Sequence, residues 1–162
     1  MTEEMRGNIC CFTGHRVLPR ERLSELSELM DRALYSMLHQ GVTEFRTGGA
    51  LGFDTLAALK VLDLRERYPQ VRLWLILPCR NQDAEWCLRD RQIYAGILER
   101  ADEVRFLRER YTAGCMQERN RALVEGAAYC IAYCKEEKGG SAYTVRYAQK
   151  KGVQVINLEE HV

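Results

Sequence analysis

Long apolar runs are absent from the sequence, and no stretch approaches the roughly 18 consecutive apolar residues that a membrane-spanning helix needs. The N-terminus, Met1-Thr-Glu-Glu4, is acidic and leads directly into a short apolar run, so the charged and apolar regions of a signal peptide are absent as well. We therefore expect a cytoplasmic protein that does not contact a membrane.

An excess of charge of one sign is also lacking. The 24 basic and 23 acidic residues leave a formal net charge of +1, whereas a protein that binds DNA or RNA normally carries a strongly basic face. Nucleic acid is therefore not the expected partner.

Signals for metals and cofactors are missing too. The seven cysteines include no Cys-x-x-Cys pair, and most lie in apolar segments, which favours buried, reduced thiols over a zinc site or a disulfide framework. The glycine loop at 48–52 matches neither the Gly-x-Gly-x-x-Gly dinucleotide fingerprint nor a P-loop. We expect no metal and no organic cofactor. The cysteines are Cys10, Cys11, Cys79, Cys87, Cys115, Cys130 and Cys134.

What the sequence does contain is a regular alternation of short apolar runs and amphipathic stretches over its 162 residues. This alternation is typical of β-α units and predicts one α/β domain over residues 1–162, with a mostly parallel sheet of about six strands. The predicted strands span residues 8–13, 43–47, 71–77, 103–107, 129–134 and 153–158. The predicted helices run from Pro19 to Gly41, from after Gly52 to near Pro69, and over 82–100, 116–127 and 141–151. The third strand is expected to end at Pro78, which cannot continue a hydrogen-bonded ladder.

Ligands of an open parallel sheet bind outside the carboxyl ends of its strands, so Thr13, Thr47, Pro78 and Cys134 are predicted to lie at one edge. The first loop at this edge is Thr13-Gly14-His15-Arg16. Its glycine allows close approach of the backbone, and its two basic side chains offer donors to an anion. The alternative is a plain turn with two solvated side chains.

The second loop, Gly48-Gly49-Ala50-Leu51-Gly52, runs directly into a helix. Free backbone N–H groups and the positive end of the helix would face whatever lies in this loop, which suits a phosphate group. Asp54, just beyond it, either caps the helix or hydrogen-bonds a ribose hydroxyl or a water molecule, and capping is the more usual role.

Glycine also precedes the last helix, in Lys138-Gly139-Gly140-Ser141-Ala142-Tyr143-Thr144, where two hydroxyls are available to cap the helix or to contact phosphate. The pattern departs from the Gly-x-Ser-x-Gly nucleophile elbow at Tyr143, so serine hydrolysis is not expected. Arg119 and Asn120 are further polar candidates, although a lone arginine on a helix is more often a solvated surface charge.

Four segments closely resemble, in order and spacing, the YpsA-like family of the SLOG superfamily. They are Phe12-Thr-Gly-His-Arg16, Gly49-Ala-Leu-Gly-Phe-Asp54, Met116-Gln-Glu-Arg-Asn120 and Gly139-Gly-Ser141. The resemblance covers about residues 8–157. It implies a Rossmann-like three-layer sandwich with a nucleotide-type pocket at the strand ends, to which all three glycine loops contribute. Related domains commonly self-associate, which leaves a homo-oligomer open.

The same superfamily contains the LOG-type nucleotide phosphoribohydrolases, and the chain departs from their pattern at the acid. Their Met-x-x-Arg-Lys helix motif is similar to residues 116–120, which keep the arginine but have Asn120 in place of the lysine. Their Pro-Gly-Gly-x-Gly-Thr-x-x-Glu loop matches at residues 139–140, but its glutamate position falls on Arg146 or Tyr147. The resemblance therefore does not imply a catalytic carboxylate at this position.

These features together predict a protein that binds a nucleotide or a nucleotide-derived ligand, as a sensor or regulator. The phosphate would be held by the loops at 48–52 and 139–141, because both lead into helix N-termini. Arg119, His15 and Arg16 would supply charge-assisted donors.

Two alternatives remain open. An enzyme that cleaves the N-glycosidic bond of a nucleoside monophosphate would need Asp54 or Glu118 in place of the missing acid, and release of the free base would distinguish it from a binding protein. Single-stranded DNA binding, in the manner of the DprA proteins of the same superfamily, is opposed by the near-neutral charge.

Overall fold

The strands form one parallel sheet, as expected when each strand is followed by a helix that carries the chain back across the sheet. The computed structural model describes residues 7–135 and 137–161. Within them, six strands pair in the order β4-β3-β2-β1-β5-β6, and every pairing is parallel. The strands are β1 (Ile9–Gly14), β2 (Glu44–Thr47), β3 (Arg72–Cys79), β4 (Glu103–Arg108), β5 (Tyr129–Tyr133) and β6 (Gln154–Asn157). The predicted Rossmann-like α/β fold is confirmed, and the strand ends near Thr13, Thr47, Pro78 and Cys134 share one edge.

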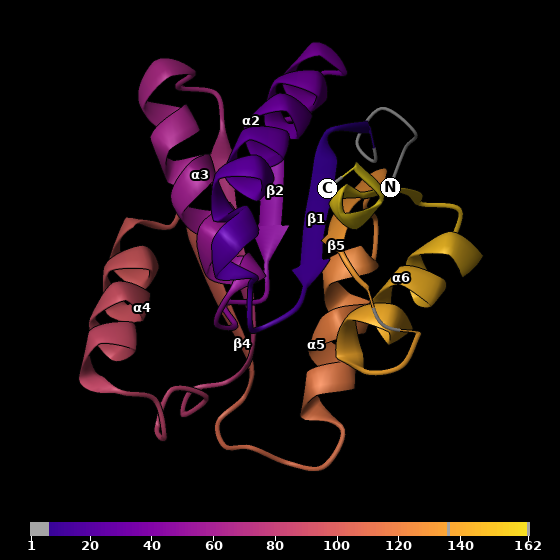
Figure 1. The fold of residues 1–162 in the computed structure, drawn as a ribbon. Helices are drawn as coiled ribbons and strands as arrows, with labels where there is room; N and C mark the ends of the chain where they lie inside the picture. The colour runs from indigo at the N-terminus through magenta and orange to yellow at the C-terminus, as the bar shows by residue number, and fades with distance from the viewer. Residues whose placement is uncertain (1–6, 136, 162) are drawn as a thin grey trace.

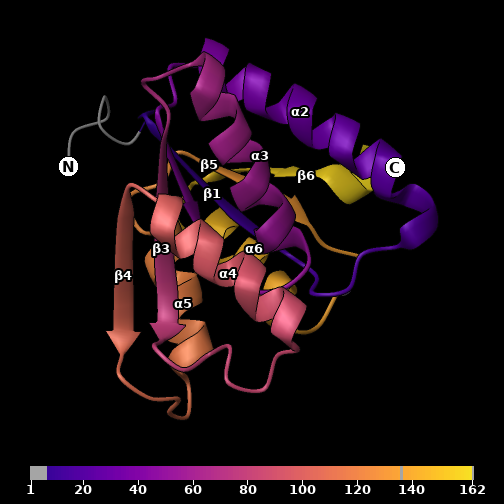
Figure 2. The same ribbon diagram turned by 90° about the vertical axis from the view of Figure 1, so that its left-hand side faces the viewer.

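Helices cover both faces of this sheet and give three layers. Figures 1 and 2 show α2, α3 and α4 on one face and α5 and α6 on the other. The helices are α2 (Leu23–His39), α3 (Phe53–Arg67), α4 (Leu88–Arg100), α5 (Cys115–Val124) and α6 (Gly140–Lys150), with 3-10 turns at Arg20–Arg22 and Leu158–His161. Among the described residues, no helix has the length and apolar character needed to cross a lipid bilayer.

The longest helix, α2, is amphipathic. Its buried side chains recur at three- and four-residue spacing, which places them on one stripe facing the sheet. They are Leu26, Met30, Ala33, Leu34 and Met37. The helix begins at Leu23, after a 3-10 turn, rather than at Pro19 as the sequence suggested. Pro19 instead precedes the turn in an extended conformation.

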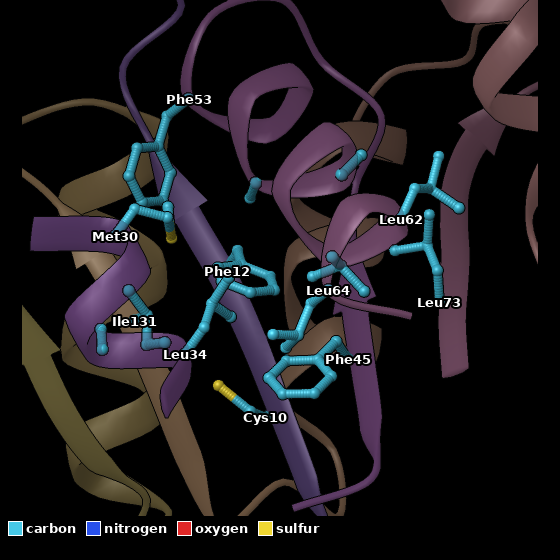
Figure 3. Packing of buried hydrophobic residues seen from close by; sticks show 14 of the residues in the cluster. Cys10, Phe12, Met30, Leu34, Phe45, Phe53, Leu62, Leu64, Leu73 and Ile131 are labelled. Atoms are coloured by element: carbon cyan, nitrogen blue, oxygen red, sulfur yellow. The ribbon is translucent and has the colours of Figure 1, made fainter. Parts of the chain in front are cut away.

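Buried strands send alternate side chains to the two faces of the sheet, and β1 shows this clearly. Cys10 and Phe12 join the larger core beneath α2, α3 and α4, whereas Ile9 and Cys11 join a smaller core beneath α5 and α6. Figure 3 shows the larger core, in which the rings of Phe12 and Phe45 stack with centroids 6.1 Å apart. The cysteines form no disulfide in the described residues, and five of the seven are buried.

The third strand continues past Pro78 to Cys79, so the expectation that it ends at the proline is wrong. β2 ends at Thr47, which pairs with Leu75, and beyond that point β3 pairs only with β4. A proline is tolerated there because one side of the strand has no neighbouring strand to receive an N–H group.

Two predicted helix boundaries also lie several residues from the observed ones. The helix expected from Gln82 begins at Leu88, and residues 80–87 form turns instead. The helix expected to reach Ala127 ends at Val124. Gly126, with a φ of 78°, then redirects the chain into β5, because a left-handed residue cannot continue an α-helix.

The outer strands of the sheet are short or charged. β4 is one edge strand and carries Glu103, Arg105 and Arg108, with the first two forming an ion pair at 3.8 Å. β6 is the other edge strand and has only 4 residues. Neither edge presents a long apolar strand.

Two glycine-to-alanine substitutions are expected to have opposite effects on stability. A Cβ on Gly14 would lie 2.4 Å from the buried ring of Phe53, so Gly14→Ala should lower the free energy of unfolding by about 1–3 kcal/mol. A Cβ on Gly96, inside α4, would meet nothing within 4 Å, so Gly96→Ala should raise it by about 0.5–1 kcal/mol. Urea unfolding of both variants measures the two changes, and shifts of the same sign would contradict this packing.

Candidate functional site

The chain leaves β1 and β5, which are neighbours in the sheet, toward opposite faces. β1 leads to α2 on one face and β5 leads to α6 on the other (Figure 1). This arrangement is the topological switch point at which open α/β sheets bind their ligands. A cavity of about 310 Å³ lies there. It is lined by Phe12, Thr13, Gly14, His15, Arg16, Ala50, Asp54, Met116, Arg119, Asn120, Leu123, Lys138, Gly139, Gly140 and Ser141.

Most of the residues proposed from the sequence line this cavity, but four members of the second glycine loop do not. Those four are Gly48, Gly49, Leu51 and Gly52. The cavity also includes residues that sequence reasoning did not select, namely Phe12, Met116, Leu123 and Lys138. Helical spacing offered a signal for two of them, because positions 116 and 123 share one face of α5 with Arg119.

Arg119 is a buried residue of the cavity wall and not a solvated surface charge. It is only 5% exposed, and its guanidinium donates hydrogen bonds to the carbonyl oxygen of Gly48 and, at 2.8 Å, to Oδ1 of Asn120. A Cβ on Gly48 would lie 2.5 Å from Nη1 of Arg119. Glycine at position 48 therefore allows the arginine to lie against the backbone.

The backbone donors of the second loop are used within the protein. The N–H group of Gly49 donates to Oγ1 of Thr47 at 3.1 Å, and that of Ala50 donates to the Asp54 carboxylate at 3.2 Å. The first N–H group of α3, on Phe53, donates to the carbonyl oxygen of His15 at 3.0 Å. The start of α3 is thus closed by a protein carbonyl, and this loop has few donors left for an anion.

The glycines of this loop allow close packing on both sides. Gly49 has a φ of 69°, and a Cβ there would lie 2.5 Å from the side chain of Leu77. A Cβ on Gly52 would lie 2.2 Å from the carbonyl oxygen of Arg16. Gln82 holds the loop from outside, because its amide nitrogen lies 3.3 Å from the carbonyl oxygen of Gly49 and 3.0 Å from the hydroxyl of Tyr94.

Asp54 lies in the first turn of α3 but does not cap it. The N-cap position is Gly52, and no side chain of the described residues caps this helix. The Asp54 carboxylate instead accepts the hydrogen bond from Ala50 and lines the cavity. Burial raises the pKa of Asp54 to about 6, against the opposing effect of the Arg119 charge.

The cavity therefore combines one carboxylate with several cations. Arg16, Arg119 and Lys138 line it together with Asp54, which is the only carboxyl group among the described lining residues. Burial lowers the pKa of Arg119, while the Asp54 charge acts in the opposite direction.

In residues 7–135 and 137–161, no three His, Cys, Asp or Glu side chains come together as a metal site would require.

The N-terminus of α6 opens onto the same cavity. Gly139 is its N-cap, with a φ of 103°, and its carbonyl oxygen accepts the N–H group of Tyr143 at 3.0 Å. The N–H groups of Ser141 and Ala142 have no acceptor among the residues that the structure describes. Gly139, Gly140 and Ser141 line the cavity, so this helix end is the one with donors available to an anion.

A family model described as the YspA SLOG family matches residues 13–158. The chain belongs to this family. Among curated proteins, it is 28% identical over 135 residues to a UPF0398 protein of Halalkalibacterium halodurans, a match that spans 82% of this chain and 71% of that protein. The family match extends from the first glycine loop past the last strand of this SLOG protein, so it includes every residue that lines the cavity except Phe12.

Solved structures show the same fold at low sequence identity. DNA processing protein A (DprA) of Streptococcus pneumoniae superposes with a TM-score of 0.66 and 17% identity over 90% of this chain, which spans 48% of that chain. DprA of Helicobacter pylori, whose single-stranded DNA binding mode has been described, gives a TM-score of 0.64 and 18% identity over 95% of this chain and 67% of that one. These likenesses place the SLOG domain in the Rossmann-like group without assigning it a ligand.

The positions that match the LOG-type glutamate lie outside the cavity of this SLOG domain. Arg146 is exposed and donates to the carbonyl oxygen of Glu137 at 2.8 Å. Tyr147 stacks on the neighbouring ring of Tyr143, with centroids 6.3 Å apart. Glu118, considered earlier as a replacement acid, points away and pairs with Arg108 at 2.9 Å.

His15 connects the two loops of the switch point. Its Nε2 accepts the N–H group of Lys135 at 2.8 Å, and its own backbone N–H donates to the carbonyl oxygen of Tyr133 at 3.3 Å. Because Nε2 is used as an acceptor, only Nδ1 is left to donate a hydrogen bond to a ligand. In this arrangement His15 holds the β1 and β5 loops together and offers at most one N–H donor to a ligand.

Proposed function

We propose that the chain is a cytoplasmic protein that binds a nucleotide or a nucleotide-derived ligand, as a sensor or regulator, with the phosphate in the cavity at the switch point. The observation that carries this proposal is the position of α6, whose unpaired first-turn N–H groups open onto a cavity that also holds Arg119 and Lys138. Helix N-termini bind phosphate through such N–H groups and through the helix dipole.

The arrangement of the cavity supports recognition of a phosphorylated sugar. Arg119 is held in place by Gly48 and Asn120, so it loses little conformational freedom when it contacts an anion. The ionised Asp54 carboxylate only accepts hydrogen bonds, so it would repel a phosphate group and could bind a ribose hydroxyl. We propose that phosphate contacts the α6 side and that ribose faces Asp54, with Thr13, Gly14 and Ala50 as the wall between them.

Substitution of Ser141 tests the α6 donors directly. Ser141→Pro removes one N–H group in the first turn, where proline is tolerated, and the preceding Gly140 has no Cβ to clash with the ring. Affinity for AMP and for inorganic phosphate should fall about tenfold, by the loss of one hydrogen bond to a charged group. Ser141→Ala, which keeps the N–H group, is the matched control and should retain most of the affinity. Calorimetric titration measures both variants.

Two results would contradict this assignment. Binding of AMP with equal affinity by wild type and Ser141→Pro would move the phosphate away from α6. Failure of the wild-type protein to bind either AMP or inorganic phosphate would contradict the proposed function itself.

The second candidate function is cleavage of a nucleoside monophosphate, and it is favoured by one observation, the raised pKa of Asp54 inside the cavity. However, that carboxylate already accepts a hydrogen bond from Ala50, and a glycosidase normally relies on a pair of carboxyl groups. We therefore expect no adenine, or only traces, to be released from AMP, as followed by chromatography. Strong release that is lost in Asp54→Asn but kept in the control Glu118→Gln would favour the enzyme instead.

Single-stranded DNA binding is the third candidate, and it is favoured by the likeness of fold to the H. pylori protein. The net charge of +1 opposes it. We expect no salt-dependent retention of a labelled single strand by the purified chain.

A further inference from the structure

A second cavity lies next to the first, at the same edge of the sheet. It has a volume of about 490 Å³, within the range of roughly 300–1,000 Å³ that is usual for small-molecule sites. His15 lines both cavities, so the two are neighbours across this side chain. The other lining residues are Val17, Leu18, Pro19, Tyr133 and Lys135.

The walls of this second cavity are mostly apolar. Val17, Leu18 and Pro19 follow one another in the loop after β1, and Val17 is 84% exposed. Tyr133 contributes an aromatic wall, and its ring stacks on that of Phe53 with centroids 6.1 Å apart. An apolar loop that faces an aromatic ring suits a flat, hydrophobic group.

Tyr133, which borders this cavity, also carries an unsatisfied polar atom. The residue is 1% exposed, and its hydroxyl is the one buried side-chain polar atom among the described residues that has no hydrogen-bond partner. Buried hydroxyls nearly always have a partner, and an exception calls for a reason. A ligand group that reaches the hydroxyl would supply the missing hydrogen bond.

Lys135 adds a preference for oxygen acceptors. Its ammonium group lies 5.9 Å from the centroid of the Tyr133 ring, so it stands over the same aromatic wall. An ammonium group can only donate hydrogen bonds. It therefore favours a ring that carries a keto oxygen over a ring that carries an amino group at that position.

We propose that the second cavity holds the base of the bound nucleotide and favours a keto base, while the phosphate lies in the first cavity on the other side of His15. This inference rests on the proposed function. It adds the class of ligand, a keto-base nucleotide, and names Tyr133 and Lys135 as residues that determine specificity.

The test compares three probes by calorimetric titration: ribose 5-phosphate, GMP and AMP. Wild type should bind GMP at least about tenfold more tightly than ribose 5-phosphate, and AMP with intermediate affinity. Tyr133→Phe keeps the ring and removes only the unpaired hydroxyl, so its thermal midpoint should not fall. Its affinity for GMP should nevertheless drop about tenfold while that for ribose 5-phosphate is unchanged.

Two further variants make the result specific. Tyr147→Phe removes the hydroxyl of a half-buried tyrosine outside both cavities, so it is the matched control and should bind all three probes as wild type does. Lys135→Met, at an exposed position, should remove the preference for GMP over AMP. Equal binding of GMP and ribose 5-phosphate by wild type, or an unchanged ratio in Tyr133→Phe, would overturn the base site and leave the phosphate site standing. Failure to bind ribose 5-phosphate and both nucleotides would overturn the proposed function as well.

Discussion

Replacement of Arg119 by methionine is expected to lower the free energy of unfolding at pH 8 by about 3 kcal/mol, because it leaves a buried carbonyl without its donor and removes the positive charge that offsets the buried charge of Asp54. Arg119 is buried, donates to the carbonyl oxygen of Gly48, and supplies the positive charge that offsets the burial of Asp54. Methionine approximates the length of arginine but provides neither the donor nor the charge. Urea unfolding at pH 8 measures the loss.

Two comparisons show whether the effect comes from burial and from Asp54. Arg121→Met changes an exposed arginine on the same helix and should alter stability little. The loss in Arg119→Met should shrink at pH 5, where Asp54 is mostly protonated and no longer needs a counter-charge. A loss of the same size at pH 5 and pH 8 would show that the two side chains do not interact.

Asp54→Asn is expected to have the opposite effect and to raise the free energy of unfolding at pH 8. The pKa of this carboxyl is about 6 in the folded protein, against an ordinary value of 3.8. The folded state thus binds the proton more tightly, so stability is fully present below the ordinary value and is lost as the pH rises to about 6. Above pH 6 the lost stability amounts to up to about 3 kcal/mol, at roughly 1.4 kcal/mol per pKa unit.

Asparagine avoids this loss because it is neutral at every pH and its amide oxygen can still accept the hydrogen bond from Ala50. The gain should therefore be largest at pH 7–8 and should vanish below about pH 4. Asp31→Asn is a suitable control, since Asp31 is half exposed and pairs with Lys60 at 2.9 Å. A variant that is less stable than wild type at pH 8 would mean that the carboxylate stabilises the fold.

A carboxylate that lowers stability indicates a functional role. Most positions of this kind would be replaced by a neutral residue if folding alone mattered, and stability is commonly lost where a site needs a strained or charged group. A stabilised Asp54→Asn variant would place Asp54 among such positions and would support its proposed contact with a ribose hydroxyl.

Sequence reasoning predicted the fold because the alternation of apolar runs and amphipathic stretches extends along the whole chain. It also placed three glycine loops at one edge of the sheet, since all parallel strands end there. The helix start at Leu88 was missed because the side chain of Gln82 reaches across to Gly49, a contact between distant segments that has no local signature.

The roles within the glycine loops were harder to predict. Gly48 and Gly140 look alike in the sequence, since each lies in a glycine pair close to a helix. Only the structure shows that the backbone at Gly48 is occupied by Arg119, 71 residues away, whereas the backbone after Gly140 faces the cavity. Which loop has unused donors depends on tertiary contacts, and these leave no pattern in the local sequence.

The edges of the sheet limit how the molecule can associate with others. A strand from another chain could add only to β4 or to β6, and β4 offers Glu103, Arg105 and Arg108 while β6 is only 4 residues long. Charged or short edge strands oppose edge-to-edge pairing and the aggregation that follows from it. Recognition by a protein partner would therefore use helix faces or the loops at the carboxyl ends of the strands. A partner at those loops would lie beside both cavities, where the presence of a ligand would alter the surface it meets.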